Sequence, residues 1–271
     1  MCSRYAGQEQ DISKLLSQMK VTLLQRNIIW GDPAANVAGA DLAVDRNPGS
    51  DLYVLPEMFS TGFCTQPQGL AESPDSPTVK WMKEKAAGTG AAIAGSIAVY
   101  EDGKYYNRFH FVTPDGEVTT YDKKHLFTFG GEHEQFTAGD ERVVVTFKGV
   151  RILLEICYDL RFPMWSRNRG DYDMIIYVAS WPTPRVDAWK TLLAARAIEN
   201  QCYVAGVNRV GTDPSNGYCG GSRLVDPYGN VIAGCEDGKE MEVTMDVDMD
   251  LLYSFRERFP VLNDSDYEDF Q

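Results

Sequence analysis

The sequence predicts an α/β fold, a four-layer α-β-β-α sandwich in which two sheets pack face to face with helices outside. Apolar segments of strand length, each followed by turn residues, recur along the 271-residue chain. Several of them are apolar without alternation, which is typical of strands that are buried on both faces. The segment FVTPDGEVTTYD is similar to RLVDPYGNVIAG, and DLYVLPE is similar to DMIIYVAS, which suggests a pair of α-β-β halves.

The first half is expected to hold both strands and helices. Gly31-Asp32-Pro33 predicts a helix start, because Asp is a favoured cap and Pro suits the first helical turn. Pro114-Asp115-Gly116 predicts the turn of a hairpin. The predicted order is a strand over 20–30, the helix after Asp32, a strand over 51–57, a helix over 78–88 that ends at Gly88, a strand over 91–100 and the hairpin over 104–124.

The second half repeats this organisation. Lys148-Gly149 predicts a hairpin turn, and Asp226-Pro227-Tyr228-Gly229 predicts another. The predicted order is a hairpin over 142–157, a buried strand over 171–181, an amphipathic helix over 187–201, strands over 202–211 and 222–234, a strand over 240–248 that closes the sheet, and a last helix over 249–259 that Pro260 stops.

No linker, low-complexity tract or short repeat divides the chain, so we expect a single domain over residues 19–260. Residues 1–18 lack the apolar core of a signal peptide and are interpreted as an N-terminal extension or the product of an upstream start codon. Residues 261–271 are interpreted as an acidic C-terminal tail.

Charge limits the choice of partners. The formal net charge is -13 and the isoelectric point is about 4.7. Because an acidic surface repels phosphate backbones and anionic lipids, nucleic acid and membrane surfaces are not expected partners. No apolar run reaches the length needed to span a bilayer.

The six cysteines are scattered, and none lies two or three residues from another, so zinc knuckles and dithiol redox motifs are not present. Without a secretory signal, this pattern predicts a protein of the reducing cytoplasm. The three histidines, His110, His125 and His133, form no HExxH pair. We therefore expect neither a metal site nor a cofactor.

Four polar residues lie where apolar strands or ordered loops end. Glu57 closes DLYVLPE, Lys123 closes the hairpin strand, Glu132 lies in the loop FGGEHEQFTAGD, and Cys157 closes VRILLEIC. Ligands collect at strand ends in sheets that helices cover, because loops there gather side chains from distant sequence. Each residue also has a structural interpretation, since buried cysteines are commonly core fillers and Lys and Glu commonly lie in solvent.

Together, these four residues are suited to nucleophilic catalysis. The thiolate of Cys157 is the nucleophile, a nearby lysine lowers the thiol pKa, and a carboxylate can accept the proton. Lys123 and the N–H of Tyr158, the residue after the nucleophile, suit the binding of an oxyanion. Glu132 is a second carboxylate that is suited to hold Lys123 in position.

The motifs PEMFSTGF, YDKKHLF, GGEHEQFTAGD, CYDLRFPMWSRN, VASWP and ARAIENQCYVAGVNRVG occur in an order that resembles the carbon–nitrogen hydrolase (nitrilase) superfamily. The resemblance covers about Val21 to Phe259 and is strongest to the omega-amidase branch. It implies an α-β-β-α sandwich that forms a homodimer or a larger homo-oligomer. It also implies Glu57 as general base, Lys123 as catalytic lysine, Glu132 as second glutamate and Cys157 as nucleophile.

The resemblance implies that the substrate is a small amide, and specifically the terminal amide of a 2-oxo acid monoamide such as 2-oxoglutaramate or 2-oxosuccinamate. The expected substrate-binding residues are Phe63, Tyr158, Arg161, Trp181 and Arg185. Of these, an arginine suits a substrate carboxylate. Deaminated glutathione, an N-carbamoyl amine or another linear amide is the alternative substrate, with loops 67–77 and 181–187 setting the width of the pocket. A non-catalytic binding protein of the same fold is a further alternative.

Glu155, Asp159 and His125 have no assigned catalytic role. Glu155 places a carboxylate inside an otherwise apolar strand, and alternation along the strand predicts that it shares a side with Cys157. In the structural interpretation, Asp159 and Arg161 are a local ion pair that fixes the turn after Cys157. His125 has no base partner at a recognisable spacing.

Overall fold

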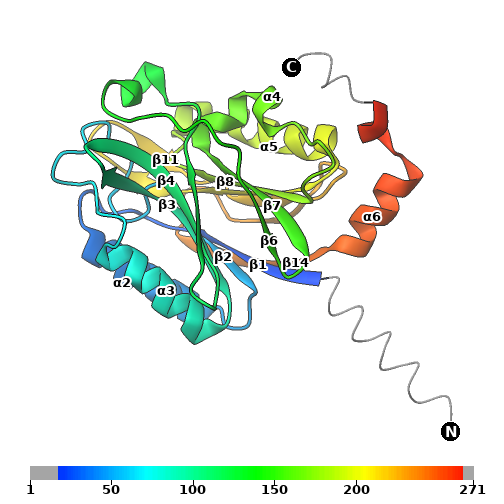
Figure 1. Cartoon of the computed structure of the whole chain (residues 1–271), viewed down its shortest axis with the longest axis horizontal. Helices are drawn as coiled ribbons and strands as arrows, with labels where there is room; N and C mark the ends of the chain where they lie inside the picture. The colour runs from blue at the N-terminus through cyan, green and yellow to red at the C-terminus, as the bar shows by residue number, and fades with distance from the viewer. Residues whose placement is uncertain (1–17, 265–271) are drawn as a thin grey trace, which may run out of the picture.

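Two six-stranded sheets pack face to face in the computed structural model, which describes residues 18–264 (Figure 1). Gln18, which was expected in the N-terminal extension, is the first residue of a strand. The expected extension over 1–17 and the tail over 265–271 lie outside the described residues. Residues 261–264 of the expected tail form a short 3-10 helix, η5.

The first sheet has the order β14-β1-β2-β3-β4-β5. Its central strands β1, β2 and β3 are parallel, and the outer pairs are antiparallel. Strand β14 comes from the end of the chain and closes this sheet beside β1, as the sequence predicts. The bounds are β1 Gln18–Gln25, β2 Leu52–Val54, β3 Ala92–Glu101, β4 Lys104–Val112, β5 Val118–Asp122 and β14 Met241–Asp248.

The second sheet has the order β13-β12-β9-β8-β7-β6 and the same plan, with β7, β8 and β9 parallel and the outer pairs antiparallel. This likeness agrees with the repeat in the sequence. The predicted strand over 202–211 divides into β9 and β10, and β10 pairs with β11 in a separate hairpin. The bounds are β6 Val144–Phe147, β7 Val150–Ile156, β8 Met174–Ala179, β9 Tyr203–Asn208, β10 Val210–Thr212, β11 Gly217–Cys219, β12 Arg223–Val225 and β13 Val231–Gly234.

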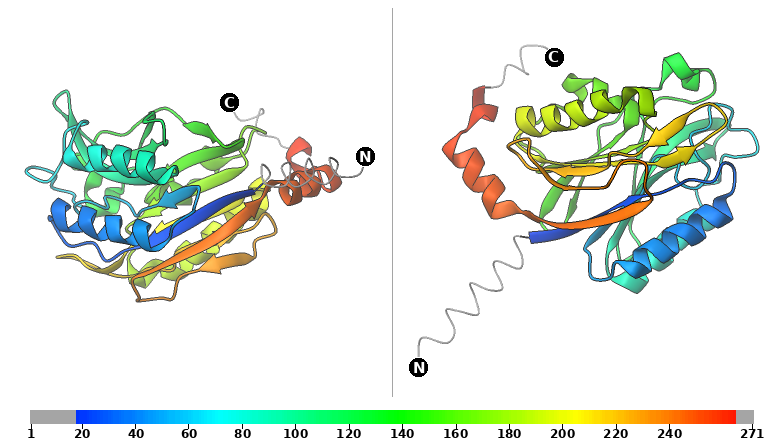
Figure 2. Two further views of the ribbon diagram at one scale, coloured as in Figure 1. Left: turned by 90° about the horizontal axis from the view of Figure 1, so that it is seen from below. Right: turned by 180° about the vertical axis from the view of Figure 1, so that it is seen from behind.

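Helices cover both outer faces, which completes the predicted four layers (Figures 1 and 2). Helices α2 (Pro33–Arg46) and α3 (Pro77–Thr89) pack on the first sheet, and α5 (Val186–Asn200) packs on the second. The core between the sheets is apolar and fully buried, and it includes Leu52, Val54, Ile152, Leu154, Ile176 and Val178. Strands buried on both faces explain the unbroken apolar runs in the sequence.

Local sequence signals set most of the helix ends. The Asp32 carboxylate accepts a hydrogen bond from the N–H of Ala35 at 3.0 Å, which caps α2 as predicted. The predicted stop of α3 at Gly88 is wrong. The helix continues to Thr89 and ends at Gly90, whose φ of 69° is the left-handed conformation that glycine tolerates best.

Two further helices, α4 (Pro163–Ser166) and α6 (Met249–Arg258), are shorter than the three that cover the sheets. Helix α4 follows the turn after β7, and α6 extends along the end of the sandwich (Figure 2). Phe259 and Pro260 follow α6, in agreement with the predicted stop. Within residues 18–264, no helix is long and apolar enough to cross a membrane.

Gly206 allows close packing of α5 on β9, and this contact yields a stability prediction. A Cβ at this position would lie 2.4 Å from Leu193 Cδ1 and 2.9 Å from the Trp189 ring. We expect Gly206→Ala to lower the free energy of unfolding by about 1–3 kcal/mol, because overpacking displaces buried side chains. The measurement is urea denaturation followed by tryptophan fluorescence.

Gly88→Ala is the matched control for that experiment. Gly88 is exposed within α3, and an added Cβ meets no atom within 4 Å. Alanine in a helix interior is favoured over glycine by about 1 kcal/mol, so this variant is expected to be as stable as the parent chain or slightly more stable. Equal destabilisation by both alanines would contradict the packing explanation.

Candidate active site

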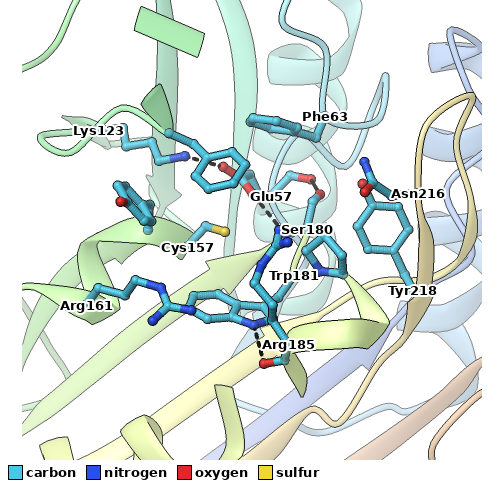
Figure 3. Close-up of a pocket in the computed structure, with 13 residues that line it drawn as sticks. Glu57, Phe63, Lys123, Cys157, Arg161, Ser180, Trp181, Arg185, Asn216 and Tyr218 are labelled. Atoms are coloured by element: carbon cyan, nitrogen blue, oxygen red, sulfur yellow. Dashed lines mark hydrogen bonds and ion pairs between the residues drawn. The ribbon is translucent and has the colours of Figure 1, made fainter. Parts of the chain in front are cut away.

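The structure brings the four predicted catalytic residues together at one end of the sandwich. Glu57 follows β2, Lys123 follows β5, and Cys157 follows β7. Glu132 opens the 3-10 helix η2 (Glu132–Glu134) in the loop after β5. The first three side chains converge on one cavity in Figure 3, with the Cys157 sulfur facing the space beside Lys123 and Glu57. Glu132 lies behind Lys123 and does not line this cavity.

Lys123 is held between two carboxylates. Its Nζ donates to Glu57 Oε1 at 2.8 Å and to Glu132 Oε2 at 2.9 Å, and all three side chains are fully buried. Burial lowers the pKa of Lys123, but the charges of Glu132 and Glu57 outweigh it, so the net pKa is raised above its ordinary value. Lys123 is therefore a permanent cation, suited to stabilising negative charge rather than to accepting a proton.

Asn107, on β4, positions both carboxylates. Its Nδ2 donates to Glu57 Oε1 at 2.7 Å and to Glu132 Oε1 at 3.0 Å, and its Oδ1 accepts from Ser96 Oγ at 3.0 Å. The other oxygen of Glu57 accepts from the backbone N–H of Ser180 at 2.8 Å. Glu57 is thus fixed from both sheets, since Asn107 belongs to the first and Ser180 follows β8 of the second.

Backbone strain marks two of the turns that carry predicted catalytic residues. Cys157 has a φ of 45° and Met58, the residue after Glu57, has a φ of 44°. The left-handed region costs a non-glycine residue roughly 1–2 kcal/mol. Such residues persist where their surroundings hold them, and they gather at functional sites. At Cys157 the strained turn ends strand β7 and presents the thiol to the cavity.

The Cys157 thiol is neutral at rest. Burial raises its pKa well above the ordinary value, and the negative charge of Glu57 raises it further, against the opposing effect of Lys123. Lys123 lowers the thiol pKa as the sequence predicts, and the net rise comes from burial and from Glu57. The thiol therefore needs a base when it reacts, and Glu57 is the buried carboxylate facing the same cavity.

All five predicted substrate-binding residues line the cavity: Phe63, Tyr158, Arg161, Trp181 and Arg185. Of the two loops expected to set its width, 181–187 lines the cavity and 67–77 does not. Pro182 belongs to the predicted loop 181–187, and the wall residues that were not predicted from the sequence are Phe127, Ser180, Asn216 and Tyr218. Asn216 and Tyr218 belong to the β10–β11 hairpin, and no local pattern points that hairpin toward the site.

Two arginines bring positive charge to the cavity (Figure 3). The Arg161 guanidinium lies over the Trp181 ring at 4.9 Å, and that of Arg185 lies over the Phe127 ring at 5.4 Å. Within the part of the chain that the structure describes, neither forms an ion pair with a carboxylate. Stacking leaves the edge donors of a guanidinium available, which suits the binding of an anionic substrate group.

The turn after Cys157 differs from the structural interpretation in one contact. Asp159 does not pair with Arg161. Its carboxylate instead accepts hydrogen bonds from the N–H of Ile156, from the Tyr121 hydroxyl and from His125. His125 therefore does have an acidic partner, 34 residues away in sequence, which spacing alone could not reveal.

Glu155 faces away from the site. It lies opposite Tyr177 in the β7–β8 ladder, on the face that the helices cover, and its Oε2 accepts from Ser166 Oγ at 2.8 Å. The prediction from strand alternation is wrong because β7 ends at Ile156 and the strained turn re-aims Cys157. Burial raises the pKa of Glu155 to about 8, and the charge of Asp159 adds to the shift.

Potential metal ligands do not gather in the described structure. Among residues 18–264, no group of three His, Cys, Asp or Glu side chains is placed to hold a metal ion. The site residues that the structure brings together are instead a thiol, an ammonium and two carboxylates, which is a set suited to acyl transfer.

Comparison with known proteins identifies the family. The family model described as carbon-nitrogen hydrolase matches residues 20–257. The chain belongs to the carbon–nitrogen hydrolase family. It is therefore a hydrolase that acts on carbon–nitrogen bonds, and the predicted α-β-β-α fold is confirmed by solved structures of this family.

Individual relatives of this carbon–nitrogen hydrolase carry more specific names. It is 46% identical over 255 residues to the omega-amidase YafV of Yersinia enterocolitica, covering 93% of this chain and 98% of that protein. It is 36% identical to the 2-oxoglutaramate amidase of Bacillus subtilis, covering 90% and 96%. The crystal structure of XC1258 from Xanthomonas campestris, which has an arsenic adduct in its active site, superposes with a TM-score of 0.90 at 43% identity, covering 92% and 97%.

Glu155 predicts a pH dependence of stability in this hydrolase. Its folded-state pKa of about 8 lies above that of an exposed glutamate, so the folded state binds the extra proton. The contribution of the protonated Glu155 to the free energy of unfolding is fully present below about pH 4. It is lost as the pH rises through about 8. We expect Glu155→Gln to be more stable than the parent chain at pH 9, by a few kcal/mol. Urea denaturation at a series of pH values is the measurement, and parallel curves for both proteins would contradict it.

Proposed function

We propose that this protein is a cysteine-dependent omega-amidase, which hydrolyses the terminal amide of a small 2-oxo dicarboxylic acid monoamide such as 2-oxoglutaramate or 2-oxosuccinamate. The observation that carries the proposal is the buried Glu57–Lys123–Glu132 cluster beside Cys157, in a cavity that two arginines line. The names of the omega-amidase and 2-oxoglutaramate amidase relatives support the same substrate class.

In the proposed first step, the Glu57 carboxylate takes the proton of the Cys157 thiol and the sulfur attacks the amide carbon. The carbonyl electron pair moves to oxygen, where Lys123 and the Tyr158 N–H stabilise the oxyanion. An ammonium has three N–H donors, and Lys123 contacts Glu57 Oε1 at 2.8 Å and both oxygens of Glu132, at 2.9 and 3.2 Å. The oxyanion is proposed to take the donor of the longer Glu132 contact, while the shorter contact to Glu132 is kept. The N–H of Tyr158 lies in the first turn of η3 (Cys157–Arg161), where helical N–H groups have no intrahelical acceptor.

The oxyanion then collapses and the carbon–nitrogen bond breaks. Glu57, now protonated, gives its proton to the departing nitrogen, and ammonia leaves behind a thioester on Cys157. In the second half of the reaction Glu57 takes a proton from water, and the hydroxide oxygen attacks the thioester carbon. Breakage of the carbon–sulfur bond releases the acid, and Glu57 returns its proton to the Cys157 sulfur. Glu132 contributes by holding Lys123 in place throughout.

The substrate carboxylate is proposed to bind Arg161 or Arg185, both of which have guanidinium donors free of carboxylate partners within residues 18–264. Phe63, Trp181 and the ring of Tyr158 supply the apolar walls for the short carbon chain. Deaminated glutathione, an N-carbamoyl amine or another linear amide is the alternative substrate for the same chemistry. A non-catalytic binding protein is disfavoured, because all four residues of the cluster are present and assembled.

A homodimer or larger homo-oligomer in the cytoplasm remains a prediction, as does a single catalytic domain over 19–260. The five cysteines within residues 18–264 are free thiols, which accords with a reducing compartment. The small-molecule amide remains the expected partner, and the acidic net charge of -13 disfavours nucleic acid.

The nucleophile assignment predicts loss of activity when the thiol is removed. Cys157→Ala is expected to release ammonia from 2-oxoglutaramate at least about 10⁴-fold more slowly than the parent chain, since the covalent step has no substitute group. Coupled detection of ammonia is the measurement. Cys219→Ala, which removes a partly exposed thiol outside the cavity, is the control and is expected to stay active. Comparable turnover by Cys157→Ala and the parent would contradict the assignment.

The carboxylate assignment predicts a selective loss of affinity. Replacing Arg161 or Arg185 by Leu is expected to raise KM for 2-oxoglutaramate by about 10–100-fold, which corresponds to a lost charged hydrogen bond of 1.5–3 kcal/mol. Turnover of butyramide, a neutral amide, is expected to change little in the same variant. Steady-state kinetics on both substrates identify which arginine is responsible, and an equal loss on both amides from both variants would contradict carboxylate recognition.

A further inference from the structure

We propose that Asp159 and His125 are positioning residues that fix the distance between Cys157 and Lys123. The two reactive groups come from different sheets, Lys123 from the first and Cys157 from the second. The Asp159 carboxylate lies between the two segments and is fully buried. This inference rests on the proposed roles of Cys157 and Lys123, and it adds residues that do not contact the substrate cavity.

One carboxylate oxygen holds the nucleophile turn. Asp159 Oδ2 accepts from the N–H of Ile156, the residue directly before Cys157, at 3.0 Å. It also accepts from the Tyr121 hydroxyl at 2.8 Å, and Tyr121 lies two residues before Lys123 on β5. The residue before the strained Cys157 is therefore held by a hydrogen bond to Asp159. This bond helps the turn to keep its unfavourable conformation.

The other oxygen holds the lysine segment. Asp159 Oδ1 accepts from the backbone N–H of His125 at 2.9 Å and lies 2.8 Å from His125 Nδ1. His125 comes two residues after Lys123, so the carboxylate contacts this segment on both sides of the lysine. We name this group of Tyr121, His125, Ile156 and Asp159 the Asp159 bridge.

The His125 ring makes a second contact between the same segments. It stacks on Phe162, the residue after η3, with ring centroids 3.8 Å apart and an interplanar angle of 7°. The edge of Trp165 also packs against it at 6.0 Å. Because Phe162 and Trp165 follow the nucleophile in sequence, His125 joins the lysine segment to the nucleophile segment through its ring as well as through Asp159.

Only a carboxylate satisfies both segments at once. Each oxygen of Asp159 accepts donors from the protein, whereas an asparagine amide has a single acceptor oxygen and an NH₂ group that donates. In either orientation the amide places its NH₂ against a backbone N–H, so either Ile156 or His125 loses its partner. Asp159→Asn is therefore a nearly isosteric change that removes the hydrogen bond to one of the two segments.

The test compares turnover with the reactivity of Cys157 itself. In Asp159→Asn we expect kcat for 2-oxoglutaramate to fall about 100-fold with KM within about threefold, because a displacement near 1 Å has that effect on a reacting pair. Alkylation of Cys157 by iodoacetamide, followed by intact-mass spectrometry, is expected to slow about tenfold. The alkylation needs no amide substrate, so it tests the bridge even if the proposed substrate is wrong.

Tyr177→Phe is the matched control. It removes a buried hydroxyl that contacts Ser166 Oγ at 2.8 Å on the helix-covered face, away from the bridge. A lost buried hydrogen bond lowers stability by about 1–3 kcal/mol, yet kcat and the alkylation rate of this variant are expected to match the parent chain. If Asp159→Asn loses thermal stability but keeps the parental kcat and alkylation rate, its role is structural only and the proposal is overturned.

A second pair of variants covers the case in which Asp159→Asn does not fold. His125→Ala removes the side-chain donor and the stacked ring, and it is expected to slow alkylation and turnover about tenfold. His125→Asn restores an N–H donor near the position of Nδ1 and is expected to recover at least half of the lost alkylation rate. An asparagine variant no faster than the alanine variant, or an alanine variant as fast as the parent, would overturn the positioning role.

Discussion

The buried cation at Lys123 is the constraint on which the rest of the site depends. A lone ammonium in a dry interior is very unfavourable, and it is tolerated only with well-placed partners. Glu57 and Glu132 provide them, and Asn107 and the Ser180 N–H fix Glu57 in turn. Lys123, both carboxylates and Asn107 come from the first sheet and its loops, and the Ser180 N–H joins this cluster to the second sheet. Loss of Lys123 would leave the two buried carboxylates facing each other without a cation, at a cost of about 3–5 kcal/mol.

Much of this arrangement could be predicted from the sequence. The unbroken apolar runs and the repeated segments predicted two sheets with helices outside, since such strands must be buried on both faces. Glu57 and Cys157 could be found because they close apolar runs, and Lys123 because it closes the hairpin strand, since strand ends collect ligands. The extended motifs then pointed to the carbon–nitrogen hydrolase family, which the family model over 20–257 confirms.

The remaining features depend on contacts that sequence patterns do not encode. Asn107 lies inside a strand, and nothing in KYYNRFHFV distinguishes it from a surface residue. The partner of His125 is 34 residues away, so spacing could not identify Asp159. Glu155 was placed on the wrong side because alternation holds only within a strand, and the left-handed φ of Cys157 ends it. The net shift of the Cys157 pKa required the balance of burial against two opposite charges.

The division of the reactive groups between the two sheets has a consequence for the chain as a whole. Glu57, Lys123 and Glu132 belong to the first half, whereas Cys157 and the Ser180 N–H belong to the second. The first half of the chain alone would have the proposed acid–base groups without the thiol. The second half alone would have the thiol without those groups. The full set of thiol, base and lysine that the proposed reaction needs is therefore assembled only when the two halves of the chain have docked.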